Sequence, residues 1–263
     1  MHALRFHRVL IIDSENWGIC DRFSNYFETI LPFTNVETAL ADGMRSALDK
    51  VTCYPPSFRG KLDSYELDFS DRSGCFINRA TSERPSIIIP DPPETLLLHD
   101  QCGGGEGWKA LQFFKFTTEV AGIVTKRLST LPSDYVALHI RAADTSLDYR
   151  KFLHLVRPRL KGQNILVCTD SVDAFQASAD ILDNSSIHQI CPILDTGGER
   201  LHDNPRYTNR DSNIHALSDL VALAKAQKIF YPTGPGIHRS GYTALAEDLS
   251  SRNYILNQLL KTK

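Results

Sequence analysis

Short apolar runs and longer stretches of helical spacing alternate along the second half of the chain. The runs predict buried strands, and the stretches, in which apolar residues recur every three or four positions, predict amphipathic helices. Because strands that alternate with helices are joined by crossovers, we expect a mainly parallel sheet. The predicted strands are 135–140, 164–168, 186–193 and 228–231, and the predicted helices are 152–160, 172–182, 214–223 and 239–249.

The first half of the chain is less regular. Residues 9–12 predict a short, fully buried strand, and Asp21 is a candidate cap for a helix over 23–31 with one apolar stripe. The stretch 55–107 is interrupted by proline and glycine, although 87–89 has the composition of a strand. A helix that Thr117 or Thr118 can cap follows this irregular stretch.

The pattern as a whole predicts an α/β protein made of two halves. The change from irregular to regular spacing places the boundary between residues 110 and 133. A chain of 263 residues is long enough for one large domain or two small ones.

Composition limits the class of protein. Lys and Arg number 29 against 31 Asp and Glu, which gives a net charge of −2, and 42% of the residues are hydrophobic. This balance argues against an electrostatic nucleic-acid binder and against a polybasic membrane anchor. We therefore expect a soluble globular protein whose partner is a small or local ligand.

Targeting signals and cysteines add two further expectations. The sequence has no apolar stretch of the roughly 18 residues that a membrane span needs, and its first residues do not resemble a signal peptide, so we expect a cytoplasmic protein. The six cysteines form no C-x-x-C pair. We expect free, mostly buried thiols and no metal site.

Polar residues follow the predicted strands at the edge where an open α/β sheet binds its ligand. We expect them to line one cleft. They are Asp13, Glu15 and Gly18 after the first strand, His139, Arg141 and Asp144 after 135–140, Thr169 and Asp170 after 164–168, and Thr233, Gly234 and Gly236 after 228–231.

His139 and Arg141 are the two residues of this set whose side chains are best suited to bind a ligand. His139 can bind a ligand, or it can be a satisfied core residue of a buried strand. Arg141 needs an anionic partner, which can be the phosphate or carboxylate of a ligand or an ion pair with Asp144 or Asp170. The sequence alone leaves both alternatives open.

The last two strand ends lead into helices. Asp170 or Ser171 can cap the helix that begins at Val172. The turn 234–236 leads into a helix with Arg239 and Ser240 in its first turn, and amides at a helix start suit a phosphate. A purely structural turn is the alternative.

Several well-known motifs are missing from the sequence. It contains no G-x-x-x-x-G-K-[ST] phosphate loop, no G-x-G-x-x-G after a strand, no H-E-x-x-H and no G-x-S-x-G. The sequence therefore gives no support to a P-loop kinase, a nucleotide-dependent dehydrogenase or a serine hydrolase.

Residues 139–144 (HIRAAD) resemble the H-[VI]-R-R-x-D peptide of the GDP-fucose-dependent fucosyltransferases. Further similar segments follow in the same order and at similar spacing: 165–171 ends in Thr-Asp-Ser, 219–230 is an Asp-led helix with its strand, and 233–244 is a turn with an Arg-bearing helix. Near the start, 18–22 (GICDR) resembles the glycine-rich loop of that family. These segments, with the sequence between them, cover about half of the chain.

The resemblance implies a GT-B-like architecture with two Rossmann-like halves and mainly parallel sheets. It implies an N-terminal acceptor-side α/β domain over 1–125 and a C-terminal nucleotide-sugar-binding domain over 126–263. It also implies an inverting, metal-independent transfer that uses no cofactor, with GDP-fucose or a related GDP-sugar as the donor substrate.

By position, the resemblance implies that Arg141 meets the diphosphate and Asp219 meets the base or ribose. Because sugar transfer develops negative charge on the departing diphosphate, Arg141 is also the candidate that stabilises this charge. The donor-binding residues that we predict are Gly18, Arg22, His139, Arg141, Asp144, Thr169, Asp170, Asp219, Thr233, Gly234, Gly236, Arg239 and Ser240.

An inverting transfer needs a base for the acceptor hydroxyl. Asp13 and Glu15 in the first loop are our candidates, with Asp21 beside them. Asp144 and Asp148, across the expected cleft, are alternatives that the spacing does not separate.

The sequence also departs from the family pattern. Ala142 replaces the second Arg of the peptide, so Arg150, Arg206, Arg210 or Arg239 would have to supply that contact. The chain is short for two Rossmann-like halves, and a partner or a second subunit is one way to complete the acceptor half. A homo-oligomer is therefore an open alternative.

Our interpretation is a glycosyltransferase that acts on a glycan or lipid-linked oligosaccharide in the cytoplasm, with a membrane-peripheral position left open. One alternative is a non-catalytic nucleotide- or glycan-binding protein with the same fold. Another is a structural subunit without nucleotide affinity.

Overall fold

The computed structural model divides the chain into two compact units. The larger unit contains Asp13–Thr34 and Gly104–Lys263, and the smaller one contains Met1–Ile12 and Asn35–Gly103. The structure describes residues 6–12, 14, 21–30, 36–37, 44–60, 66–68, 75–77, 93–98, 107–142, 147–193, 209–233 and 239–262.

The boundary between the compact units differs from the division into 1–125 and 126–263. Position 125 lies inside helix α4 (Thr118–Leu128), and a continuous helix does not part there. In addition, strand β2 (Phe27–Thr29) pairs antiparallel with β8 (Phe114–Phe116). This pairing ties the segment 13–34 to the larger unit.

The larger unit is built on a four-stranded parallel sheet. Its strands are β9 (Val136–Ile140), β10 (Asn164–Thr169), β11 (Ser186–His188) and β12 (Ile229–Phe230). Their order across the sheet is β11-β10-β9-β12, and all three pairings are parallel. The first strand of the sheet in chain order is therefore central, as in a Rossmann fold.

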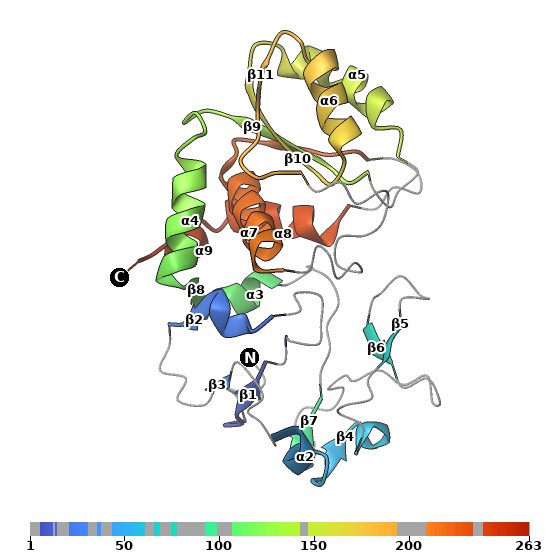
Figure 1. The fold of residues 1–263 in the computed structure, drawn as a ribbon, viewed down its shortest axis with the longest axis vertical. Coiled ribbons are helices and arrows are strands. Elements are labelled where there is room, and N and C mark those ends of the chain that lie inside the picture. Colours follow the sequence, from blue (N-terminus) through green and yellow to red (C-terminus); the bar gives the residue numbers. More distant parts are fainter. Residues whose placement is uncertain are drawn as a thin grey trace. The chain divides into compact units, whose positions relative to one another are not determined.

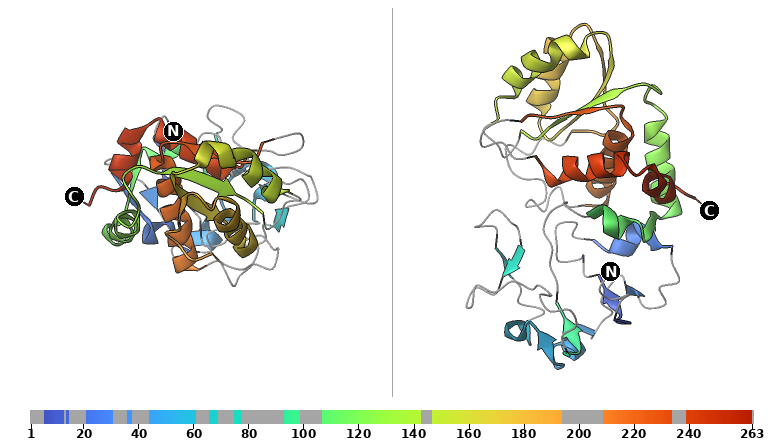
Figure 2. Two further views of the ribbon diagram at one scale, coloured as in Figure 1. Left: turned by 90° about the horizontal axis from the view of Figure 1, so that it is seen from above. Right: turned by 180° about the vertical axis from the view of Figure 1, so that it is seen from behind.

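Helices cover both faces of this sheet, with α5 and α6 on one side and α7 and α8 on the other (Figures 1 and 2). The α/β class and the mainly parallel sheet are confirmed. The helices of the larger unit are α3 (Gly107–Leu111), α4, α5 (Tyr149–Leu160), α6 (Val172–Ile181), α7 (Arg210–Lys225), α8 (Gly241–Ser250) and α9 (Asn253–Leu259).

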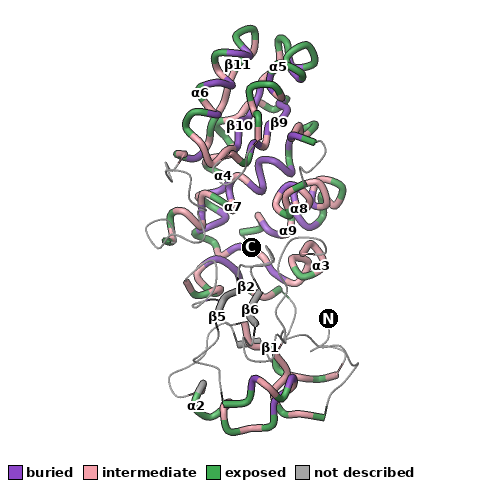
Figure 3. The backbone as a smooth tube through the Cα atoms, turned by 90° about the vertical axis from the view of Figure 1, so that its right-hand side faces the viewer, coloured by how far each residue is buried: buried purple, intermediate pink, exposed green. Residues whose placement is uncertain are grey.

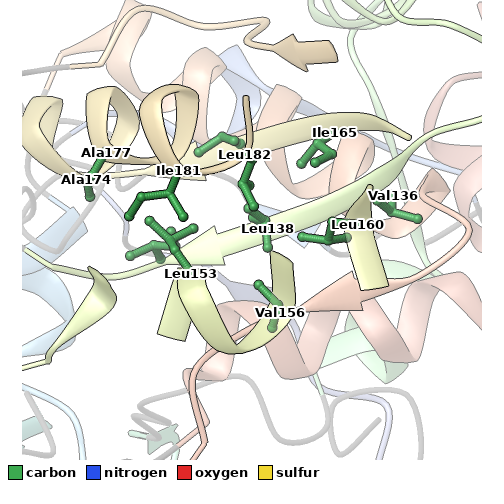
Figure 4. Close-up of a cluster of buried hydrophobic side chains, with 12 residues drawn as sticks. Val136, Leu138, Leu153, Val156, Leu160, Ile165, Ala174, Ala177, Ile181 and Leu182 are labelled. Carbon is green, nitrogen blue, oxygen red and sulfur yellow. The ribbon is translucent and has the colours of Figure 1, made fainter. Parts of the chain in front are cut away.

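A hydrophobic cluster joins the sheet to α5 and α6 (Figure 4). Leu138 and Ile140 of β9 pack in it against Leu153 of α5, and all three are fully buried. Because side chains alternate along a strand, His139 points to the opposite face, toward α7 and α8. Figure 3 shows the continuous buried stretches of β9 and β10.

Side-chain caps begin the helices at the predicted places. Thr117 Oγ1 accepts a hydrogen bond from the amide of Val120 at the start of α4. Ser171 Oγ accepts from the amide of Ala174 at the start of α6, 3.2 Å away. Both capping predictions are confirmed, because short hydroxyl side chains satisfy amides that have no partner within the helix.

The predicted helix over 23–31 is wrong. A 3-10 turn (η1, Phe23–Asn25) leads directly into β2. The aromatic stripe is buried by packing across the pair of strands instead: Phe23 stacks on Phe27 with 4.6 Å between ring centroids, and Phe114 meets Phe23 edge-on. Stacking between aromatic rings stabilises this arrangement without a helix.

The smaller unit contains short paired strands. Within the predicted strand 9–12 a strand forms at Leu10–Ile11, but the prediction that it is fully buried is wrong, since Val9 is 55% and Leu10 38% exposed. The predicted strand at 87–89 lies outside the described residues. The elements are β1 (Leu10–Ile11) parallel to β3 (Val36–Glu37), β4 (Cys53–Tyr54) parallel to β7 (Leu96–Leu97), β5 (Glu66–Asp68) antiparallel to β6 (Cys75–Ile77), α2 (Met44–Leu48) and η2 (Pro56–Phe58).

The membrane and cysteine expectations concern residues that the structure describes in part. Within the described residues, no helix is long and apolar enough to cross a membrane. Cys53, Cys168 and Cys191 are free and buried.

The two leucines of α5 provide a matched pair for testing the core. Leu153 is fully buried, whereas Leu155 is 76% exposed. We expect Leu153→Ala to lower the free energy of unfolding by about 2–5 kcal/mol, because it leaves a cavity between α5 and the sheet. Leu155→Ala should change it by less than about 0.5 kcal/mol. Urea denaturation measures both, and equal effects would contradict this description of the core.

Candidate functional site

The strand order creates a switch point between β9 and β12. From β9 the chain continues to β10 on one side, whereas β12 pairs on the other side, with Phe230 opposite Leu138. In open α/β sheets the ligand crevice lies at the carboxyl ends of the strands at such a point. Arg141 follows β9 and Thr233 comes shortly after β12, and both side chains are exposed.

His139 is held at this edge by α8. Its Nδ1 lies 2.5 Å from Oγ1 of the buried Thr243, and its ring lies 5.5 Å from the ring of Tyr242. Burial, with a smaller contribution from the charge of Arg141, lowers the pKa of His139 to about 4. His139 is therefore neutral at physiological pH. It is packed inside the fold, as a satisfied core residue would be, and it also adjoins the candidate ligand site.

A hydroxyl relay connects His139 to the start of α8. Ser240 Oγ accepts the amide hydrogen of Thr243 at 3.0 Å, and the two hydroxyl groups lie 2.9 Å apart. Ser240 was predicted from the sequence and Thr243 was not. An N-cap serine accepts the amide hydrogen of the second or third residue of its helix, which here is Thr243, but this rule does not indicate a contact with His139.

Asp170 organises the backbone after β9. Its Oδ1 accepts a hydrogen bond from the amide of Ala142 at 2.7 Å, and the side chain of Ala142 packs against the cluster beneath α5. Thr169 Oγ1 accepts from the amide of Ser171. Asp170 thus fixes the direction in which the chain leaves β9 at Arg141.

Arg239, in the segment before α8, forms an ion pair with Glu247 at 3.1 Å. Arg239 is 43% exposed along its side chain. A phosphate that approached the start of α8 would therefore compete with Glu247 for this guanidinium.

A second network lies at the start of α7. Asp21 accepts hydrogen bonds from Tyr26 at 2.6 Å, from Asn25 at 2.7 Å and from the amide of Arg22 at 2.7 Å. Asn213 of α7 donates to the Tyr26 hydroxyl at 2.8 Å. This network fixes the residues around Arg22 on the larger unit.

These bonds change the titration of both acidic groups. Burial raises the pKa of Asp21, but its hydrogen bonds outweigh burial and the net pKa is lowered. Burial and the bond to Asp21 raise the pKa of Tyr26 to about 12. Asp21 is a weak base, because its carboxylate already accepts three hydrogen bonds and its pKa is low. Asp148 is engaged as the N-cap of α5. Neither residue is therefore well suited to deprotonate an acceptor hydroxyl.

Asp219 has its contacts inside the fold. The Cys191 thiol donates a hydrogen bond to the Asp219 carboxyl group, and the positive charge of Arg127 also acts on it. The Arg127 guanidinium in turn donates to Ser218 Oγ at 2.9 Å. Burial raises the pKa of Asp219 to about 7. The described contacts of Asp219 are with this interior cluster, and its role toward a base or ribose stays a prediction.

The remaining predicted residues lie outside the described part of the chain. They are Asp13, Glu15, Gly18, Asp144, Gly234 and Gly236. Within the described ranges, no group of three or more His, Cys, Asp or Glu side chains is arranged to hold a metal ion.

The described site is suited to an anion. It combines an exposed guanidinium, a neutral imidazole and the first amides of a ten-residue helix at one edge of the sheet. Arginine forks and helix starts both stabilise phosphate oxygens.

Comparison with solved structures identifies the class of fold as that of the GT-B-like fucosyltransferases. The chain is similar to the crystal structure of fucosyltransferase NodZ from Bradyrhizobium, with a TM-score of 0.61 and 16% sequence identity over 94% of this chain and 84% of that chain. It is also similar to NodZ alpha-1,6-fucosyltransferase soaked with GDP-fucose, with a TM-score of 0.56 and 15% identity over 93% and 83% of the two chains. No protein-family model matches the sequence, and no curated protein matches it.

The raised pKa of Asp219 predicts a specific pH dependence of stability. Because its folded pKa of about 7 exceeds the ordinary 3.8, this carboxyl contributes stability at acid pH that is lost as pH rises from about 4 to 7. Asp219→Asn removes this loss. We expect the difference in unfolding free energy, variant minus wild type, to grow by more than about 1.4 kcal/mol across that interval, which corresponds to one pKa unit. Parallel curves would show that the carboxyl is not desolvated.

Proposed function

We propose that this protein is an inverting, metal-independent glycosyltransferase that moves fucose from GDP-fucose, or a related GDP-sugar, to a hydroxyl group of a glycan. The observation that carries the proposal is the exposed Arg141 at the switch point of the sheet, two residues after His139, which contacts Thr243 of α8. The fold is that of fucosyltransferases, and one similar structure was soaked with GDP-fucose.

The donor diphosphate is assigned to this edge. Arg141 forks onto the phosphate oxygens, and the first amides of α8, with Ser240, meet the same anion. His139 reaches the donor as a neutral imidazole, oriented through its Nδ1 contact with Thr243. Gly18, Arg22, Asp144, Thr169, Thr233, Gly234, Gly236 and Arg239 complete the proposed donor site, with Asp170 holding the backbone beside it.

The chemistry follows from this placement. The acceptor oxygen attacks the anomeric carbon from the face opposite the diphosphate, the new carbon–oxygen bond forms, and the bond to the diphosphate oxygen breaks with its electron pair. A carboxylate takes the acceptor proton, for which Asp13 and Glu15 are the proposed candidates. Arg141 stabilises the charge that develops on the leaving GDP.

The acceptor is assigned to a glycan or a lipid-linked oligosaccharide, and a second copy of the chain is a candidate to complete the acceptor side. A specific observation supports the alternative of a non-catalytic nucleotide-binding protein. Ala142, which replaces an arginine of the family peptide, packs against the apolar cluster beneath α5 and offers no charge.

Substitution of Arg141 tests the donor site. We expect GDP to bind the wild type, and we expect Arg141→Ala to weaken binding by about 10- to 100-fold, as the loss of a charged hydrogen bond predicts. Arg141→Lys should recover only part of the affinity, because an ammonium group does not form the paired, bidentate hydrogen bonds of a guanidinium. Isothermal calorimetry with GDP, UDP and ADP measures this and the base preference.

Arg157→Ala is the matched control. Arg157 is an exposed arginine that pairs with Asp183. It lies in the last turn of α5, whereas Arg141 precedes the first turn of that helix. Equal loss of GDP affinity in both variants would contradict the assignment of Arg141. Binding without any release of fucose from GDP-fucose, to water or to a glycan, would favour the non-catalytic alternative.

A further inference from the structure

A cationic face runs along the outer side of α5. The segment 149–161 contains five Lys or Arg residues and no Asp or Glu, in a chain whose net charge is −2. All five are exposed, and Figure 3 shows the outer side of the helix exposed above its buried inner side. These residues are Arg150, Lys151, Arg157, Arg159 and Lys161.

Four of these cations have no acidic partner within the described part of the chain. Arg157 is paired with Asp183 at 2.8 Å, and the guanidinium of Arg150 lies over the Tyr149 ring. The carboxylates of the described residues therefore do not neutralise most of the charge on this helix. The cations that form no ion pair with a described carboxylate are Arg150, Lys151, Arg159 and Lys161.

An exposed apolar side chain lies within the cationic face. Leu155 is 76% exposed, while the inner face of α5 is already filled by Leu153, which is fully buried. Lys151 and Arg159 lie four residues before and after Leu155, so the three side chains form one row on the helix surface. Interfacial helices likewise combine an exposed apolar side chain with Lys and Arg on the polar side.

We propose that the outer face of α5, formed by the row Lys151, Leu155 and Arg159 with Arg150 and Lys161 at the two ends of the helix, docks on an anionic lipid bilayer. The ammonium and guanidinium groups meet the lipid phosphates while their alkyl stems and Leu155 enter the acyl boundary. The inner face of α5 stays packed on the sheet, so docking requires no unfolding. This inference does not depend on the proposed transfer reaction.

The neutral overall charge of the chain does not oppose this proposal. Charges interact over about 8 Å at physiological salt, so a bilayer senses the face that lies on it and not the sum over the chain. A near-neutral total charge is therefore compatible with a locally cationic face on α5. The local signal in the sequence was the absence of acidic residues between 149 and 161.

Vesicle sedimentation of the full chain tests the proposal. We expect binding to vesicles of phosphatidylcholine with phosphatidylglycerol, weaker binding at high salt, and little binding to phosphatidylcholine alone. Lys151→Gln with Arg159→Gln should lower partitioning by about 25-fold, since each cation near an anionic surface contributes about fivefold. Leu155→Ser should weaken binding at low and high salt alike, because its contribution is apolar.

The control removes two cations elsewhere. Lys126 and Lys225 are exposed lysines in the last turns of α4 and α7, and Lys126→Gln with Lys225→Gln should leave vesicle binding unchanged. An equal loss in the control variant, equal binding to neutral vesicles, or no vesicle binding by protein with an intact melting transition would overturn the proposal. Binding to RNA or a sulfated polysaccharide without binding to vesicles would also overturn it.

Discussion

The candidate site depends on one constraint, the central position of β9 in a parallel sheet. Because β10 and β12 pair with opposite edges of β9, the chain must leave β9 at a point where the crossovers diverge. This geometry puts Arg141 at the open edge and buries Leu138 and Ile140 beneath α5 and α6. The same strand therefore anchors the core and presents the charged group of the site.

The second half of the fold could be predicted from the sequence because its burial follows a regular period. The apolar spacing of α5 and α6 matches the contacts that they make with the sheet. The region 23–31 could not be predicted in the same way, since its aromatic residues suit a helical stripe and also suit stacking across β2 and β8. The strand forms because β2 pairs with β8, about 90 residues further along the chain, and the local pattern of apolar residues contains no sign of this pairing.

The candidate site was predictable where it follows strand ends and less so where it depends on packing. His139, Arg141 and Ser240 were identified because ligand sites lie at carboxyl edges. Thr243 and the bond between Asp170 and the Ala142 amide arise only when α8 and β10 come beside β9. Asp219, which the family resemblance assigns to the donor, has its described contacts with Cys191 and Arg127, and no spacing rule indicates such an interior cluster.

Hydrogen–deuterium exchange of the full chain with and without GDP shows whether a nucleoside diphosphate binds where β9 and β12 diverge. We expect slower exchange at Arg141 and Ala142, at Tyr231 and Thr233, and in the first turn of α8, with no change at β11 or at the end of α5. Protection confined to the smaller unit, or uniform exchange with and without GDP at saturating concentration, would contradict it.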